Sequence, residues 1–233
     1  NFIVYDKSGK YSTAWAYDIL QDKKGRIWMG SYQGGVFVMD KAALLSGKTI
    51  ADWHYSDKGK NALSGLHVGQ MVMDGKGRIW VSTYNRLDCI NPNSMKVVQV
   101  ANSDVVNYLM ADSKGNIWMG DNTSVTCYYA AGSVLGNSFP SKTWQIAGKV
   151  STMCDVEGKI WVVSGNECCV IDPQGESQRF VIPSIVPLTI CYSRQTHQVM
   201  MGGNDGYVAI SSDVAQKPKQ FTRLMLAGII VNG

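Results

Sequence analysis

A nine-residue motif that recurs along the chain constrains the fold more than any other feature. It reads DKKGRIWMG at Asp22–Gly30 and returns as DGKGRIWVS at Asp74–Ser82, DSKGNIWMG at Asp112–Gly120 and DVEGKIWVV at Asp155–Val163. A degenerate fifth copy ends in QVMMGG at Gln198–Gly203. The tryptophans, and the methionine that replaces the last one, follow one another at 52, 38, 43 and 39 residues. A period of roughly 40 to 45 residues with strand-like units is typical of a β-propeller.

Each copy lies in a unit that reads as four consecutive strands. An apolar strand precedes the motif, and Asp-x-x-Gly then makes a tight hairpin because Asp bonds back to the backbone and Gly accepts a positive φ. The Ile-Trp pair lies on the second strand, so we expect one side chain of each pair to pack on each neighbouring blade. The sequence therefore predicts an all-β fold, a β-propeller with five recognisable four-stranded antiparallel blades.

The two ends of the chain differ from the repeating units. Asn1–Tyr5, NFIVY, reads as a fourth strand without a blade; it either completes the last blade, whose own unit stops after its third strand, or belongs to an earlier one. We expect residues 1–215 to form the propeller and 216–233 a linker and the first strand of a following domain. Neither a signal peptide nor an apolar run of about 20 residues, the length that crosses a bilayer, is recognisable.

Composition and spacing argue against several kinds of partner. The net charge of +4 is mild, and no run of Lys and Arg exceeds two residues, so nucleic-acid binding is not expected. The six cysteines show no CxxC spacing, and the three histidines follow no metal-ligand spacing. The sequence therefore predicts no metal site and no cofactor.

The repeating units carry a resemblance to a known family. DKKGRIWMGSYQGGVFVMD at Asp22–Asp40 and DGKGRIWVSTYNRLDCIN at Asp74–Asn91 resemble the two-component regulator propeller repeat, which builds the periplasmic sensors of hybrid two-component systems in Bacteroides-type bacteria. FTRLMLAGIIVNG at Phe221–Gly233 resembles the first strand of the β-sandwich that follows such propellers. The resemblance implies a periplasmic part of an inner-membrane protein, which touches the membrane only through the parent protein. It also implies glycan-derived ligands, a homodimer in the parent protein and a separate histidine kinase domain.

Propeller geometry places candidate ligand residues on one face. The segments leading into the first strands and the turns between second and third strands emerge together there, whereas the motif acids emerge on the opposite face and are expected to form turns. Aromatic rings suit the apolar faces of a sugar, and amides or Arg suit its hydroxyl and carboxylate groups. The candidates are Trp15, Tyr32, His67, Tyr84, Arg86, Asn122, Asn166 and Asn204. The needs of turns explain the three asparagines better than ligand contact does, and a structural role between two apolar neighbours is favoured over ligand contact for His67.

These patterns predict a non-catalytic sensor domain that binds an oligosaccharide and signals by rearranging a dimer. A protein-docking propeller scaffold is the alternative. A glycan-active enzyme is less favoured, because it needs two carboxylates at a defined separation. No motif ties together any pair among the acids of the candidate face, Asp18, Asp121, Glu167 and Asp205.

Overall fold

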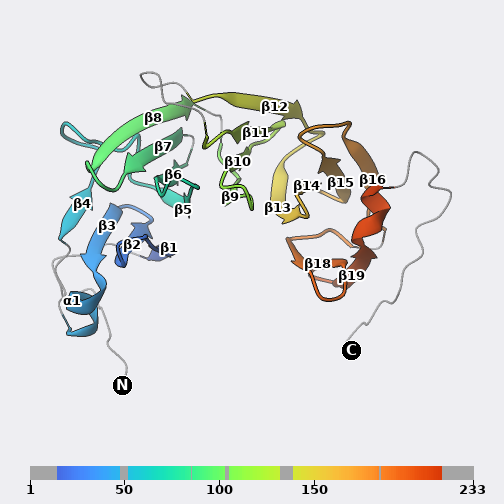
Figure 1. Cartoon of the computed structure of the whole chain (residues 1–233), viewed down its shortest axis with the longest axis horizontal. Helices are drawn as coiled ribbons and strands as arrows, with labels where there is room; N and C mark the ends of the chain where they lie inside the picture. Colours follow the sequence, from blue (N-terminus) through green and yellow to red (C-terminus); the bar gives the residue numbers. More distant parts are fainter. Residues whose placement is uncertain are drawn as a thin grey trace.

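Five antiparallel sheets, each one blade, succeed one another along the chain. The computed structural model describes residues 15–47, 52–84, 86–102, 105–131, 139–183 and 185–216, and the expectations for Asn1–Tyr5 and Phe221–Gly233 lie outside these residues. The strand order within each sheet follows the chain, from an inner first strand to an outer last strand. The predicted all-β propeller fold is therefore confirmed (Figure 1).

The blades have the following bounds. Blade 1 comprises β1 (Ala16–Gln21), β2 (Arg26–Ser31), β3 (Gly35–Asp40) and β4 (Trp53–Tyr55), and blade 2 comprises β5 (Val68–Met73), β6 (Ile79–Thr83), β7 (Arg86–Asn91) and β8 (Lys96–Asn102). Blade 3 comprises β9 (Tyr108–Ala111), β10 (Ile117–Gly120), β11 (Ser124–Tyr128) and β12 (Ser141–Gln145). Blade 4 comprises β13 (Val150–Val156), β14 (Lys159–Ser164), β15 (Glu167–Ile171) and β16 (Gln178–Val181). Blade 5 comprises β17 (Thr189–Ser193), β18 (Gln198–Gly203) and β19 (Gly206–Ser211), followed by the 3₁₀ helix η1 (Ser212–Gln216).

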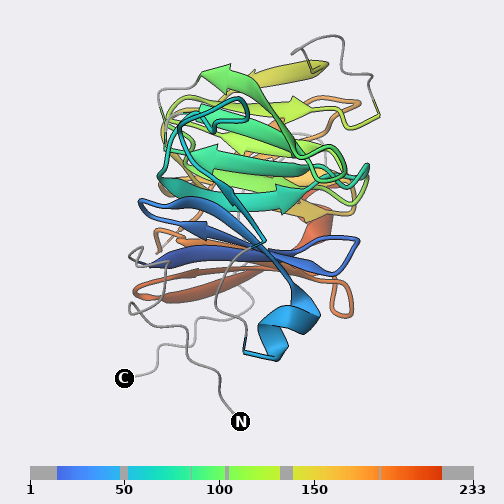
Figure 2. The same ribbon diagram turned by 90° about the vertical axis from the view of Figure 1, so that its left-hand side faces the viewer.

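Blade 5 has three strands in the described part of the chain, where the other blades have four. A short helix, α1 (Lys41–Leu45), was not predicted; it begins where the Asp40 carboxylate accepts a hydrogen bond from the Ala43 amide. Figure 2 shows α1 projecting from the end of β3. No helix among the described residues is long and apolar enough to span a bilayer.

The five blades form an open arc. Strands β1, β5, β9 and β13 lie toward its centre, and β4, β8, β12 and β16 lie at its rim (Figure 1). Four clusters of buried side chains join each blade to the next, and within the described residues no such cluster joins blade 5 to blade 1. Blades 1 and 5 therefore face an opening between them (Figure 1).

The motif tryptophans form the core of the blade interfaces. Trp28, Trp80, Trp118 and Trp161 are each 0% exposed. Trp80, for example, packs with Leu109 and Ile117 of blade 3, whereas its neighbour Ile79 packs toward blade 1. Removing such rings from water stabilises the arc strongly, since a large apolar side chain contributes about 1.5–3 kcal/mol on burial. The expected division of each Ile-Trp pair between two neighbours is confirmed at this interface.

Three of the motif acids organise the turns and hold the tryptophans. One carboxylate oxygen of Asp74 accepts from the Lys76 and Arg78 amides at 3.0 and 2.9 Å, and the other accepts from the Trp80 indole nitrogen at 2.9 Å. Asp22 and Asp112 repeat this pattern with Trp28 and Trp118. The glycines of these turns, Gly25, Gly77 and Gly115, have φ of 80°, 81° and 79°. These three motif acids therefore form turns, as the repeat predicts.

The fourth copy folds differently, although its spacing is the same. Glu157 and Gly158, with φ of 54° and 85°, make a two-residue turn directly between β13 and β14. Asp155 consequently lies within a strand, and its carboxylate accepts from the Gly158 amide at 2.8 Å and from the Ser113 amide of blade 3 at 2.6 Å. The buried indole nitrogen of Trp161 has no hydrogen-bond partner among the described residues.

Candidate functional site

Five aromatic side chains follow one another across blades 1 and 2 at the end where the second strands finish. We call Trp15, Tyr17, Tyr32, His67 and Tyr84 the aromatic row. The ring centroid of Tyr32 lies 5.8 Å from that of Trp15, 5.6 Å from that of Tyr17 and 3.7 Å from that of His67. The His67 and Tyr84 centroids lie 5.9 Å apart. The row therefore joins rings from two blades into one aromatic surface.

Strand connections bring these rings together. Trp15 and His67 directly precede the inner strands β1 and β5, whereas Tyr32 and Tyr84 directly follow β2 and β6. The Tyr32 amide donates to the Trp15 carbonyl at 3.1 Å. The segment leading into a first strand therefore meets the turn between second and third strands, as propeller geometry predicts.

Backbone hydrogen bonds also fasten this face from one blade to the next. The Gly35 amide of blade 1 donates to the Leu66 carbonyl at 3.0 Å, next to His67. The Val106 amide, which precedes blade 3, donates to the Tyr84 carbonyl at 2.9 Å. Each of these bonds ties a β2–β3-type turn to the segment that leads into the following blade. The backbone beneath the aromatic row is thus hydrogen-bonded from each blade to the next.

The segment that carries His67 is anchored by a buried acid. The Asp88 carboxylate is fully buried and accepts from the Ser64 amide at 2.8 Å and from the Ser64 hydroxyl at 2.6 Å. Burial raises the pKa of Asp88, while the Ser64 bonds and the nearby charge of Arg86 oppose the rise. Leu63, which is 2% exposed, fixes the same segment in the blade 1–blade 2 cluster.

Two residues of the row have an unfavourable backbone conformation and solvent-exposed rings. Trp15 and Tyr84 both have φ of 54°, in the left-handed region that bulky residues avoid, and they are 65% and 62% exposed. Such a conformation costs on the order of 1–3 kcal/mol and persists where the surroundings impose it. Here it leaves two large rings uncovered instead of burying them. Strained, exposed aromatic residues of this kind are candidates for contact with a ligand.

The structure brings together four of the eight predicted site residues: Trp15, Tyr32, His67 and Tyr84. Arg86 is half-buried at the start of β7, where its charge acts on Asp88. Asn122 is exposed in the β10–β11 turn of blade 3, and its carbonyl accepts from the Asn107 amide group at 2.9 Å. Asn166 and Asn204 are exposed in blades 4 and 5 and do not join the aromatic row.

Tyr17 is the member of the row that the sequence analysis missed. It is 54% exposed on β1, and its ring meets that of Tyr32 edge to face. If side chains alternated strictly along β1, Tyr17 would lie on a sheet face of blade 1 and not at the end of the blade where the row lies. The pairing of β1 with β2, however, shifts register between Ala16 and Asp18. A bulge of this kind re-aims a side chain and has no clear signature in a single sequence.

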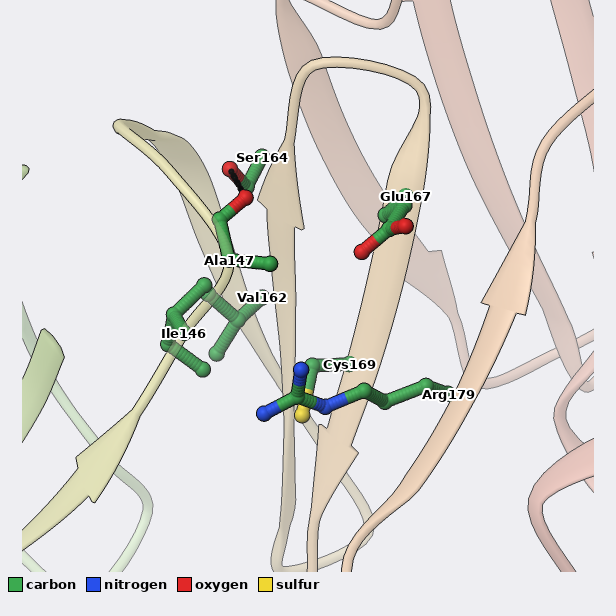
Figure 3. Close-up of a pocket in the computed structure, with 7 residues that line it drawn as sticks. All are labelled: Ile146, Ala147, Val162, Ser164, Glu167, Cys169 and Arg179. Carbon is green, nitrogen blue, oxygen red and sulfur yellow. Dashed lines mark hydrogen bonds between the residues drawn. The ribbon is translucent and has the colours of Figure 1, made fainter. Parts of the chain in front are cut away.

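A hollow between blades 3 and 4 is too small and too occupied to serve as a ligand pocket (Figure 3). Its empty volume is about 180 Å³, below the roughly 300–1,000 Å³ of usual ligand pockets. Arg179 reaches across it past Cys169 and donates to the Gln145 carbonyl at 2.6 Å, while Glu167 lies at the opposite end (Figure 3). Across the described residues, no three His, Cys, Asp or Glu side chains are grouped as a metal site.

Two of the four acids of the candidate face, Asp18 and Asp121, act as structural acceptors. Asp18 accepts from the Met71 amide of blade 2 at 2.6 Å. Asp121 accepts from the Thr123 and Ser124 amides at 2.7 and 2.6 Å and from the Ser124 hydroxyl at 2.8 Å. Both carboxylates are therefore already committed to backbone donors, which does not favour an acid pair for glycoside hydrolysis.

Comparisons with known proteins agree with this architecture. The sequence profile of the two-component regulator propeller matches residues 10–33 and 62–85. The extracellular domain of a putative hybrid two-component system from B. thetaiotaomicron is 27% identical, with a TM-score of 0.74 over 85% of this chain and 28% of that one. A second such domain from the same organism is 18% identical, with a TM-score of 0.66 over 92% of this chain and 32% of that one.

Virginiamycin B lyase from Staphylococcus aureus is 16% identical, with a TM-score of 0.60 over 85% of this chain and 67% of that one, which shows a shared fold alone. The comparison with curated proteins gave no match. This chain spans about 28% of the length of the two-component neighbour at 27% identity. The resemblance expected from the sequence is thus confirmed: two of the repeating units match the two-component regulator propeller, and the chain folds like the extracellular domain of a putative hybrid two-component system.

Proposed function

We propose that this chain is part of the ligand-sensing domain of a periplasmic sensor, and that it binds an oligosaccharide at the aromatic row without turning it over. The observation that carries the proposal is the pair of exposed rings, Trp15 and Tyr84, held at φ of 54° on either side of Tyr32 and His67. The likeness to extracellular domains of hybrid two-component systems supports a sensor in that location.

The chemistry of the row suits a sugar chain better than a compact ligand. Flat rings accept the apolar faces of pyranose rings, and the Tyr hydroxyls and the His67 ring nitrogens supply hydrogen bonds to sugar hydroxyls. The Asn107–Asn122 amide pair on blade 3 adds donors and acceptors beyond the Tyr84 end of the row. A linear oligosaccharide lying from blade 1 toward blade 3 would use both regions.

Signalling requires more than affinity. A ligand shifts a conformational equilibrium only by its difference in affinity for the two states. In the proposed mechanism the parent protein forms a homodimer, and the bound oligosaccharide favours one arrangement of the two protomers. This change in arrangement is transmitted to the histidine kinase domain of the parent protein.

Calorimetric titration of the purified chain with a panel of neutral and acidic oligosaccharides tests the proposal. Tyr84→Ala and Trp15→Ala are expected to weaken binding at least about tenfold, which corresponds to roughly 1.4 kcal/mol for each lost ring contact. Trp53→Ala is the matched control, because Trp53 is an exposed aromatic residue on the outer strand β4, outside the row. Binding that survives both row substitutions, or a panel without any ligand, contradicts the proposed site.

A further inference from the structure

Three polar side chains meet where blade 5 lies against blade 4, at the end of the blades opposite that of the aromatic row. Glu157 lies in the β13–β14 turn, Tyr192 lies on β17, and His197 directly precedes β18. The His197 Nδ1 atom is 3.2 Å from Glu157 Oε1 and 3.2 Å from the Tyr192 hydroxyl oxygen. The Tyr192 hydroxyl donates to the same Glu157 oxygen. Three atoms with lone pairs thus converge from two blades, and we call these residues the Glu-Tyr-His cluster.

The Glu-Tyr-His cluster suits a cation at its centre. The Tyr192 hydroxyl has a single proton, which it donates to Glu157, and a neutral histidine carries a proton on only one of its ring nitrogens. When that proton is on Nε2 of His197, the Nδ1 lone pair faces the Glu157 carboxylate, and a cation between the two atoms removes their repulsion. The cation is either a second proton on the imidazole or a metal ion.

The ligand types and distances match a transition-metal ion. Imidazole nitrogen and carboxylate oxygen bind first-row divalent metals such as Zn²⁺. Ligand atoms bonded at about 2.0–2.1 Å to a tetrahedral ion lie roughly 3.3–3.4 Å from one another. The two 3.2 Å distances from His197 Nδ1 are close to this value. Glu157 and His197 could therefore bind one ion after only small movements of their side chains.

The backbone holds the two charged members of the cluster toward each other. Glu157 and His197 both have left-handed backbones, with φ of 54° and 53°. The Gly158 amide, next to Glu157, donates to the Asp155 carboxylate at 2.8 Å. The His197 carbonyl accepts from the Ser212 amide at 2.9 Å. Both turns are thus fixed by hydrogen bonds, so the ligand atoms are already together before an ion arrives.

A buried hydroxyl without a partner lies beside the cluster. Ser212 is 4% exposed, and its Oγ atom has no hydrogen-bond partner among the described residues. Its proximity to Tyr192 is seen in the pKa of Tyr192, which the bond to Glu157 raises and the Ser212 hydroxyl lowers in part. Buried polar groups are normally paired. A water bound to an ion in the cluster would supply the partner that Ser212 lacks.

We propose that the Glu-Tyr-His cluster binds one divalent first-row transition-metal ion, represented by Zn²⁺, through Glu157 Oε1 and His197 Nδ1, with the Tyr192 hydroxyl as third ligand. The His197 and Glu157 side chains are 67% and 45% exposed, so water completes the coordination. Grouping of His, Cys, Asp and Glu alone finds no metal site among the described residues, because a tyrosine supplies the third oxygen here. Sequence spacing does not reveal the cluster either, since Glu157 and His197 are 40 residues apart.

An ion at this position cross-links blade 5 to blade 4, where two features of the other blades are missing. The Trp161 indole nitrogen has no acceptor among the described residues, and blade 5 has three strands in the described part of the chain. Because the ligands come from both blades, the ion binds the folded interface and stabilises it. The proposal is independent of the oligosaccharide site, which lies at the other end of blades 1 and 2.

Calorimetric titration of the full chain, without a histidine tag and stripped of metal with EDTA, with ZnCl₂ tests the proposal. One ion per chain is expected. The Tm should rise by roughly 5–10 °C at free Zn²⁺ about 100 times the Kd, and amide hydrogen exchange should slow in the β13–β14 and β17–β18 turns. His197→Asn and Glu157→Gln should each weaken binding at least about tenfold, since even outer-shell partners of metal ligands contribute about 10–100-fold. Asparagine also tolerates the positive φ of His197.

His67→Ala is the matched control, because it removes a histidine of the aromatic row and should leave Zn²⁺ binding unchanged. Metal-free variants that unfold at the wild-type Tm show that the substitutions leave the fold intact. If a variant is less stable, protection of the two turns by Zn²⁺ in the wild type still reports the site. Absence of binding up to millimolar Zn²⁺, or binding that is equally strong in His197→Asn, overturns the proposal and leaves a proton as the cation of the cluster.

Discussion

Trp161 and Asp155 are six residues apart, as are the three earlier Asp and Trp pairs of the repeat, yet no hydrogen bond joins them. The cause is the turn between β13 and β14, which takes only two residues and leaves Asp155 paired with Ile160 inside the sheet. The same motif therefore produces two local structures, one in which the acid holds the indole and one in which the acid reaches the neighbouring blade at Ser113.

This difference predicts unequal effects of removing two aligned acids. Asp74→Ala should lower the free energy of unfolding by about 3 kcal/mol, because it leaves the Trp80 indole and the largely buried Arg78 guanidinium without their acceptor. Asp155→Ala removes two backbone contacts from a half-buried carboxylate and should cost only about 1 kcal/mol. Urea denaturation of the two variants measures the difference, and equal losses would contradict it.

The lowered pKa of Asp22 predicts that the folded protein loses stability in acid. Burial of its carboxyl group opposes ionisation, but hydrogen bonds from Trp28 and Arg26 outweigh burial and hold the pKa of Asp22 below its usual value of 3.8. Because the folded-state pKa is lowered, the contribution is fully present above the unfolded value and is lost as the pH falls through the folded value. Asp22→Asn should therefore be less stable than the wild type at pH 6, and the gap should shrink below pH about 3.8. Denaturation curves across this range check the expectation; a gap of constant size contradicts it.

The cysteines are expected to differ sharply in reactivity. Cys191 is exposed on β17, whereas burial raises the pKa of Cys89 and Cys127 to about 12 and that of Cys154 to about 11. Thiolate is the reactive form, so the buried thiols should resist alkylation in the folded protein. Iodoacetamide followed by mass spectrometry should label Cys191 first, and Cys191→Ser should abolish the early product. Early labelling of Cys89 would contradict the buried arrangement.

Replacing Tyr84, whose backbone conformation is strained, should affect stability and ligand binding differently. Tyr84→Gly should leave the free energy of unfolding unchanged or raise it by up to about 1 kcal/mol, because glycine accepts the φ of 54° that tyrosine resists. The same change removes an exposed ring of the proposed site and should weaken oligosaccharide binding. Tyr32, which is absent from the positive-φ residues, is the control: Tyr32→Gly should lower stability. A stability loss at Tyr84 equal to that at Tyr32 would show that the backbone there is not strained.

Much of the fold could be predicted from the sequence because the same pattern of strands and turns recurs in successive repeats. The alternation that places Ile79 and Trp80 on opposite sides of β6 requires only strand periodicity, and the structure confirms it. The short turn of blade 4 could not be predicted in this way. Its acid, glycine and tryptophan keep the spacing of the other copies, and the positive φ of Glu157 depends on how the whole hairpin packs.

The candidate site was predictable in part for a related reason. Propeller connectivity alone places Trp15, Tyr32, His67 and Tyr84 at one end of blades 1 and 2, and the ring contacts show that they meet. Connectivity does not say how far apart two turns lie around the arc, so Asn166 and Asn204 could not be distinguished from residues near the row. The position of Tyr17 in the row could not be predicted, because the direction of its side chain depends on a register shift in β1 that only the strand pairing in the structure reveals.

The hydrogen bonds that link neighbouring blades at the Gly35–Leu66 and Tyr84–Val106 contacts use only backbone atoms. Gly35 itself must remain glycine, because its φ is 75° and an added Cβ would clash with the Tyr55 carbonyl oxygen. The other residues of these turns need no particular side chain for the bonds, so substitutions there can change the chemistry presented to solvent while the backbone contacts stay intact. A protein built in this way can acquire a new specificity through substitutions in one turn after another, with each successive variant still able to fold. The attachment of each turn to its neighbour is thus what leaves its side chains free to diversify.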